Sequence, residues 1–263
     1  MAQTTIAKSK RTRKPKHQEQ EAVPCLVPTP PTDLVVEDDE PLESDWHVQQ
    51  IHLFTDLIHQ LWNPKTDFFA GANMFVYYSE TQAEAIKKKR TAYKGPDFFV
   101  VKDVDGTKPR ECWVAWDEEG RYPDVIFELS SPSTVKKDKE ENLVLYSRTF
   151  GTLEYFIYDP YRGELLGYRL TARKDYEPIV PDERGWLWSE QLEVWVGLWE
   201  GVYRNRRRVW VRWWTVDGEL VPTPFEAERA RAEAERQRAE AEQARAEKLA
   251  QRLRELGFDP DTV

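Results

Sequence analysis

The stretch that decides the fold reads GPDFFVV over residues 95–101 and PDVIFELSSPST over residues 123–134. Each half carries an acidic residue beside a short apolar run: Asp97 opens the first run, and Glu128 lies within the second. Apolar runs of this length are typical of buried strands. A carboxylate among apolar side chains is costly unless it is paired or bound to a cation. The stretch therefore predicts a divalent metal site at Asp97 and Glu128, with a helix cap or a buried ion pair as the structural alternative.

The elements around this stretch indicate an α/β protein with a mixed central sheet. Helical spacing of apolar residues predicts the helices, and short apolar runs predict the strands. In chain order, we first expect a helix over residues 44–62, a strand over 67–79 with a bend at Gly71, and a polar loop with the basic run 87–90. Strands at 98–101, 112–116 and 124–129 follow. A helix over 136–150 then leads to an antiparallel pair of strands at 153–158 and 164–170. This order implies at least one parallel crossover.

A histidine in the first predicted helix has two interpretations. His47 falls in the first turn of the helix expected over residues 44–62, where Ser44 can act as the cap. It could line a site, or it could be an ordinary surface or core histidine, which is the simpler interpretation.

The second half of the chain is predicted to be β-rich. Residues 171–221 are dense in tryptophan, and Asp217-Gly218 indicates a tight turn between strands at 209–214 and 219–221. The run RNRRR at residues 204–208 precedes these strands. Basic residues beside aromatic residues can bind nucleic acid, but an exposed loop joining two strands is the simpler interpretation.

The last part of the sequence predicts one long helix over residues 223–257. Thr223 and Glu226 form a capping box around Pro224, and Gly257 fits a C-terminal cap. The helix is rich in Ala, Glu and Arg, and its apolar positions trace a thin heptad seam. It is expected to be a weak coiled coil or a solvated arm.

Composition and charge limit the classes to which the protein can belong. The 263 residues carry a net charge of −9, so a protein that acts on DNA with this charge needs a local basic patch or a metal. No segment approaches the ~18 consecutive apolar residues of a membrane span. The two cysteines do not suggest a disulfide framework. The N-terminus shows no secretory signal, so we expect a cytoplasmic protein by elimination.

The same patterns divide the chain into three parts. Residues 1–42 have little apolar material and are expected to form a disordered tail. The basic run at residues 8–16 either contacts nucleic acid or is simply solvated. Residues 43–221 are expected to form one domain, and residues 222–263 the charged helix.

Several motifs together resemble a known family. They are Gly95-Pro96-Asp97, the run from Val125 to Thr134, Asp138, Tyr146, and the run from Glu154 to Pro160. This combination is similar to the Uma-type family of restriction-endonuclease-like proteins, a large family abundant in cyanobacteria, within the PD-(D/E)xK nuclease superfamily. The resemblance runs from about Glu43 to the C-terminus. It implies a restriction-endonuclease-like mixed sheet flanked by helices, and hydrolysis of DNA phosphodiester bonds with Mg²⁺ or Mn²⁺.

The resemblance assigns two of the three expected catalytic positions. Asp97 matches the family's metal-binding aspartate and Glu128 its glutamate. The superfamily's lysine lies two residues after the glutamate, where this chain has Ser130. The family commonly places it four residues before the tyrosine, where this chain has Asn142. Lys136 is therefore the preferred candidate for the catalytic cation, being nearest the turn after the glutamate strand, ahead of the neighbouring lysines at positions 137 and 139.

Two functions from different classes remain open at this point. The first is a Mg²⁺-dependent DNA endonuclease that uses Asp97, Glu128 and Lys136. The second is a catalytically weakened relative that binds nucleic acid or protein, and Asn142 is the residue that favours it. Relatives of this fold often act as dimers, so a homodimer through the nuclease body or the C-terminal helix is a further expectation.

Overall fold

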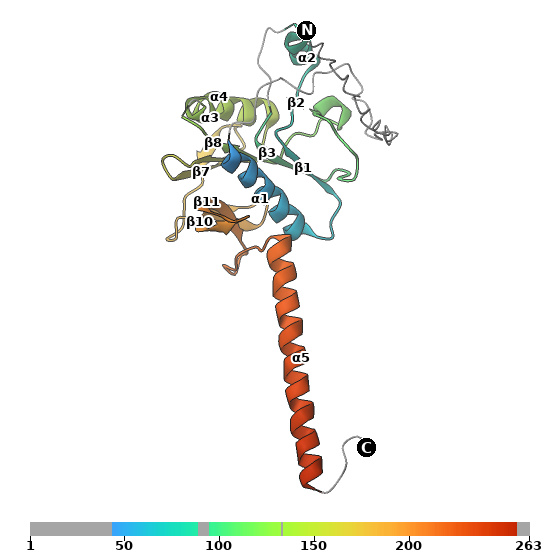
Figure 1. Ribbon diagram of the computed structural model, residues 1–263. Helices are drawn as coiled ribbons and strands as arrows, with labels where there is room; N and C mark the ends of the chain where they lie inside the picture. Colours follow the sequence, from blue (N-terminus) through green and yellow to red (C-terminus); the bar gives the residue numbers. More distant parts are fainter. Residues whose placement is uncertain (1–43, 89–94, 133, 257–263) are drawn as a thin grey trace, which may run out of the picture.

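The computed structural model describes residues 44–88, 95–132 and 134–256 (Figure 1). The predicted tail over residues 1–42, and Gly257 with its predicted cap, lie outside the described residues. The expected α/β class is confirmed: a mixed central sheet carries helices on its faces, and one long helix extends from the body.

The central sheet has six strands in the order β1-β3-β5-β6-β7-β8. The strands β5 and β6 run parallel, and every other neighbouring pair in this sheet is antiparallel. The expected parallel crossover is therefore confirmed. The strands are β1 (Phe68–Ala72), β3 (Phe98–Lys102), β5 (Val125–Leu129), β6 (Glu154–Asp159), β7 (Glu164–Leu170) and β8 (Tyr176–Pro178).

The crossover between β5 and β6 is one nearly continuous helical segment, as predicted. It consists of α3 (Val135–Lys139), α4 (Glu141–Val144) and a π-helical turn over Leu145–Phe150. Gly151 ends it in the left-handed conformation, with φ 68°, a backbone geometry that glycine adopts without steric cost.

Strand β5 is buried along its whole length because helices and a second sheet cover its two faces. Helix α1 (Asp45–Trp62) packs on one face, where Phe54 and Phe127 have ring centroids 4.6 Å apart. Tyr146 from the crossover packs on the other face together with Ile126. The near-continuous apolar run around Glu128 follows from this double coverage.

The second sheet has three antiparallel strands in the order β11-β10-β9. They are β9 (Leu187–Ser189), β10 (Val194–Tyr203) and β11 (Arg206–Trp214). The run RNRRR is only partly a loop: Arg204 (φ 45°) and Asn205 (φ 65°) form the two-residue turn, and the other three arginines begin β11. A two-residue turn with both φ values positive matches the twist of a hairpin. The strand expected at residues 219–221 is reduced to one bridge between Trp214 and Leu220.

The segment over residues 67–79 differs from the single strand predicted for it. It forms two strands, β1 and β2 (Val76–Tyr77), because Asn73 takes a left-handed conformation with φ 45° between them. Asparagine tolerates that conformation better than most residues. Strand β2 pairs in parallel with β4 (Trp113–Val114) in a separate two-stranded sheet, and a 3₁₀ helix over Ala115–Asp117 follows β4.

The polar loop predicted before Asp97 is partly helical. Helix α2 (Glu80–Lys87) begins at Ser79, whose side chain accepts a hydrogen bond from the backbone N–H of Gln82. Lys88 follows the helix and pairs with Glu84 at 2.9 Å. The rest of the basic run over 87–90 lies outside the described residues.

Helix α5 (Pro224–Glu255) projects from the body in Figure 1 and has no buried residue. Its N-terminus is the predicted capping box: Thr223 accepts from the backbone N–H of Glu226, and Glu226 accepts from the backbone N–H of Thr223. The carboxylate of Glu226 also binds the fully buried guanidinium of Arg212 at 2.8 Å, which fixes the helix to the second sheet.

Two smaller observations complete the fold. Cys112 is buried and has no disulfide partner among the described residues. None of the helices in the described part of the chain is long and apolar enough to cross a membrane.

Candidate functional site

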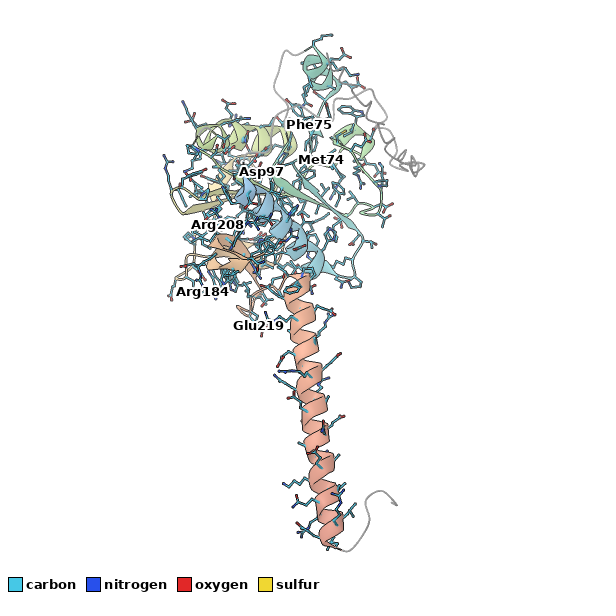
Figure 2. All side chains as sticks on the ribbon, viewed as in Figure 1. Met74, Phe75, Asp97, Arg184, Arg208 and Glu219 are labelled. Atoms are coloured by element: carbon cyan, nitrogen blue, oxygen red, sulfur yellow. The ribbon has the colours of Figure 1, made fainter. Side chains whose placement is uncertain are left out.

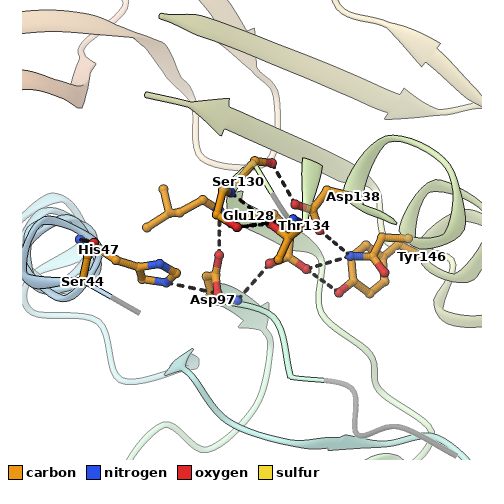
Figure 3. A network of polar contacts seen from close by, with 11 residues as sticks. Ser44, His47, Asp97, Glu128, Ser130, Thr134, Asp138 and Tyr146 are labelled. Atoms are coloured by element: carbon orange, nitrogen blue, oxygen red, sulfur yellow. Dashed lines mark hydrogen bonds and ion pairs between the residues drawn. The ribbon is translucent and has the colours of Figure 1, made fainter. Parts of the chain in front are cut away.

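Asp97 and Glu128 meet at the end of the central sheet (Figure 3). Asp97 directly precedes β3, and Glu128 is the fourth residue of β5, the strand that pairs with β3. Oδ2 of Asp97 accepts a hydrogen bond of 2.6 Å from the backbone N–H of Leu129. The backbone N–H of Asp97 in turn lies 3.3 Å from Oε2 of Glu128. The structure thus brings together the two acids that the sequence singles out; their role as metal ligands stays a prediction.

Glu128 is the most strongly perturbed carboxylate of the site. Its side chain is buried, and burial raises its pKa well above the ordinary value of 4.5. The neighbouring charges of Asp97 and Asp138 raise the pKa further. Hydrogen bonds from the hydroxyl of Tyr146, 2.7 Å from Oε1, and from the backbone N–H of Asp97 lower the pKa in part. The side-chain amide of Asn142 also donates to Oε1, at 3.2 Å. These contacts hold the carboxylate in a fixed orientation, but no Lys or Arg among the described residues forms an ion pair with it to offset the loss of water.

Asp138 on α3 is a third acid of the site, for which the sequence predicted no role as a ligand. Its Oδ1 accepts from Nδ2 of Asn142 at 3.0 Å, and its Oδ2 accepts from the hydroxyl of Ser130 at 2.8 Å. The side chain is buried, which raises its pKa. Helical spacing offered a signal for this contact, since Asp138 lies four residues before Asn142 and shares its face.

His47 is a buried histidine that lies beside Asp97, so the structure agrees with the core interpretation and also places the side chain next to the candidate site. Its Nε2 lies 3.2 Å from Oδ1 of Asp97, and its side chain is only 7% exposed. The N-terminal turn of α1 places it there: Ser44 caps the helix and accepts from the backbone N–H of His47. The sequence predicted this turn and its cap, but the contact with Asp97 joins residues 50 positions apart and has no local signal.

The three lysines that follow Glu128 differ in their exposure and in their contacts. Lys136 is exposed on α3, and its ammonium group makes no ion pair or hydrogen bond with any residue in the described part of the chain. Lys137 is also exposed, and its charge lowers the pKa of Asp138. Lys139 is committed elsewhere, because it forms an ion pair with Glu164. The catalytic role of Lys136 therefore stays a prediction.

The donor set fits a hard divalent cation that keeps much of its water. Among the described residues, no group of three or more His, Cys, Asp or Glu side chains is arranged to hold a metal. Mg²⁺ needs only one or two carboxylates, because it fills the rest of its octahedron with water and substrate oxygens. Asp97 and Glu128 would be those two carboxylates, and each of their oxygens can accept more than one contact. A divalent cation would also relieve the like-charge repulsion that raises the pKa of Glu128.

Comparison with known proteins identifies a family and a likeness to a solved structure. Residues 35–206 match the Uma2 family, described as "Putative restriction endonuclease". No curated protein matches the sequence. Among solved structures, the chain is similar to "a putative nuclease belonging to DUF820 from Anabaena variabilis ATCC 29413", with 16% identity and a TM-score of 0.38 over 54% of this chain and 74% of that chain. A TM-score of this size supports no argument about function.

Proposed function

This chain belongs to the Uma2 family, and on that premise we propose that it is a divalent-metal-dependent endonuclease that hydrolyses DNA phosphodiester bonds. The observation that carries the proposal is the pairing of the half-buried Asp97 with the buried Glu128, where β3 begins and β5 ends. Their contact through the Asp97 backbone N–H, and the raised pKa of Glu128, are what a carboxylate pair shaped for a cation would show.

In this proposal Asp97 and Glu128 hold Mg²⁺ or Mn²⁺. A divalent metal at such a site polarises the phosphate and lowers the pKa of a bound water, which supplies the nucleophile. The protein contributes the orientation of the ligands. His47 fixes Oδ1 of Asp97, and Tyr146 fixes Oε1 of Glu128. Such supporting contacts commonly change metal affinity or activity by 10- to 100-fold when they are removed.

The third catalytic component is proposed to be Lys136. A cation near the attacking water orients it and stabilises the charge that develops in the transition state. The exposed ammonium group of Lys136 is uncommitted within the described residues, so it is able to approach a phosphate bound at the carboxylates. Exchange of Lys136 for methionine, compared with the same exchange at the ion-paired Lys139, tests this assignment by the rate of DNA cleavage.

A second candidate function rests on Asn142. Its amide occupies the space between Glu128 and Asp138, where the family pattern would place a lysine. A neutral amide cannot stabilise a developing negative charge as a cation does. The alternative is therefore a nuclease fold that binds nucleic acid or protein with little or no turnover.

A plasmid-nicking assay in Mg²⁺ or Mn²⁺ separates the two functions. We expect the wild-type protein to nick the plasmid, and Asp97→Asn and Glu128→Gln to lower the rate by about 100-fold or more. Glu177→Gln is the matched control, because Glu177 is an exposed acid on β8. Cleavage that survives both site substitutions would overturn the first function. DNA binding by a wild-type protein that does not cleave would support the second.

Self-association through α5 or through the nuclease body belongs to the same proposal. The helix has no buried residue, and two leucines of the predicted seam, Leu249 and the C-cap Leu256, are 62% exposed each. Sedimentation before and after deletion of residues 224–263 tests the contribution of the helix. An unchanged number of subunits per particle would exclude self-association through α5.

A further inference from the structure

Four arginines gather at the end of the β10–β11 hairpin, within the run RNRRR. Arg204 lies in the two-residue turn, and Arg206, Arg207 and Arg208 are the first residues of β11. All four side chains are exposed or half-buried. The tryptophans further along the strand, Trp210 and Trp213, are fully buried and do not take part in this surface.

One line of contacts connects this hairpin with the candidate site through α1. Both oxygens of the Asp45 carboxylate bind the guanidinium of Arg206, at 2.6 Å and 2.9 Å. Asp45 is the first residue of α1, and His47 in the same turn contacts Asp97. The arginine cluster is therefore fixed, through Arg206, to the first turn of α1. His47 in that turn contacts Asp97, one of the two candidate metal ligands.

A second line of contacts reaches the site through the central sheet. The hydroxyl of Tyr158 donates to the backbone carbonyl of Val209, the residue after Arg208, at 3.3 Å. Tyr158 pairs with Leu129 in the β5–β6 register, and the backbone N–H of Leu129 binds Asp97. In the view of Figure 2, Arg208 is on the side of the β10–β11 sheet that faces Asp97.

The four arginines differ in whether they are already neutralised. Arg206 is bound to Asp45, and Arg204 lies 3.8 Å from Asp56. Arg207 reaches Glu200 at 3.7 Å, but both side chains are at least 70% exposed, and such pairs contribute little. Arg208 is exposed, and within residues 44–88, 95–132 and 134–256 no carboxylate pairs with it. Arg207 and Arg208 are thus the members that are available to a ligand.

From this arrangement we propose that Arg207 and Arg208 bind the phosphate backbone of DNA beside the candidate site. The choice of DNA rests on the proposed function. A chain with a net charge of −9 repels a polyanion, and the acids of the site add to that repulsion at the point of contact. Two available guanidinium groups on the hairpin that contacts the first turn of α1 supply the local positive charge that is needed. Their planar donor geometry matches the oxygens of a phosphate.

The proposal is tested by fluorescence anisotropy of a labelled DNA duplex in EDTA, where no cleavage takes place. We expect the double variant Arg207→Gln, Arg208→Gln to bind about tenfold more weakly at moderate salt. The slope of log affinity against log salt concentration should fall in size by about two, since each phosphate contact contributes about 0.9. The matched control is Arg231→Gln, Arg238→Gln, which removes the same charge from exposed positions on α5 and should bind as the wild type does.

Each other outcome of the experiment has a definite meaning. Equal affinity of the hairpin variant and the wild type would overturn the proposal, and so would a wild-type protein that does not bind the duplex. If poly-glutamate displaces the labelled duplex as effectively as unlabelled DNA does, the surface binds any polyanion, and the assignment to nucleic acid is overturned. If the wild-type protein never nicks plasmid but the hairpin variant still binds DNA more weakly, the endonuclease proposal is refuted and the DNA-binding role of Arg207 and Arg208 stands. Unchanged melting temperatures show that the variants fold.

Discussion

The side-chain amide of Asn142 donates to Oε1 of Glu128 at 3.2 Å, deep in the candidate site. The same nitrogen lies 3.0 Å from Oδ1 of Asp138, so one neutral group bridges two buried carboxylates. An amide satisfies hydrogen bonds but supplies no net charge to offset the two acids. A bound proton or a divalent metal would balance the charge that Asn142 leaves uncompensated.

Restoring a cation at this position should increase turnover. We expect Asn142→Lys to raise the plasmid-nicking rate by about tenfold or more, because an ammonium group between Glu128 and Asp138 would stabilise charge that develops on the phosphate. The two carboxylates would also keep a buried lysine charged. Initial nicking rates in Mg²⁺ measure the effect.

Asn142→Met is the control for this substitution, since methionine has similar length and no charge. It should not raise the rate. A lysine variant that folds, as judged by its melting temperature, but cleaves no faster than the wild type would show that position 142 does not take the catalytic cation.

The stability of the metal-free protein should fall as pH rises above about 4.5. Burial and nearby acids raise the folded-state pKa of Glu128 above its ordinary value of 4.5, so the folded state holds this proton more tightly than the unfolded state does. Within the window between the two pKa values the free energy of unfolding therefore decreases with pH, by up to about 1.4 kcal/mol per pH unit for one proton. Urea unfolding in EDTA at several pH values measures the slope.

Glu128→Gln separates this effect from all other titrations. The glutamine variant has no carboxyl group to titrate at position 128. Its free energy of unfolding, relative to that of the wild type, should therefore increase as pH rises. Glu235→Gln, at an exposed position on α5, should follow the wild type. A constant difference between Glu128→Gln and the wild type from pH 4.5 to 8 would mean that Glu128 is not perturbed in solution.

The attachment of α5 should depend on one ion pair. We expect Glu226→Gln to lower the free energy of unfolding by about 2 kcal/mol, because it leaves the fully buried Arg212 without its carboxylate partner. Glutamine keeps the hydrogen bond of the capping box, so the loss reports the ion pair. Chemical denaturation measures it.

Glu233→Gln provides the comparison on the same helix. Its partner Arg236 is 65% exposed, and the change should be below about 0.5 kcal/mol. Equal losses in the two variants would contradict the role of Arg212 in holding α5 to the body.

Most helices and strands of the structure could be predicted from the sequence, because local patterns of apolar, capping and turn residues determine them. The apolar run around Glu128 required a strand covered on both faces, and Thr223 with Glu226 predicted the start of α5 as the structure has it. The proximity of Asp97 and Glu128 followed from neighbouring strands. The break at Asn73 was missed, because its left-handed conformation depends on where β1 and β2 find their separate partners.

The rest of the site depends on contacts between distant parts of the chain. His47 reaches Asp97 from a helix 50 positions earlier, and its own surroundings in the sequence resemble those of any amphipathic helix. The run RNRRR likewise acquires its position beside the site only through Asp45 and Tyr158, which come from other elements. No periodicity within one segment contains this information.

The central claim, that Asp97 and Glu128 hold a divalent metal, is tested most directly by crystals soaked in Mn²⁺ and measured at the manganese absorption edge. We expect one anomalous peak at about 2.2 Å from oxygens of both carboxylates, within the range of oxygen ligands to such cations. The peak should be absent in crystals of Glu128→Gln. Wild-type crystals with no peak at this position, or with a peak that persists in the variant, would contradict the claim.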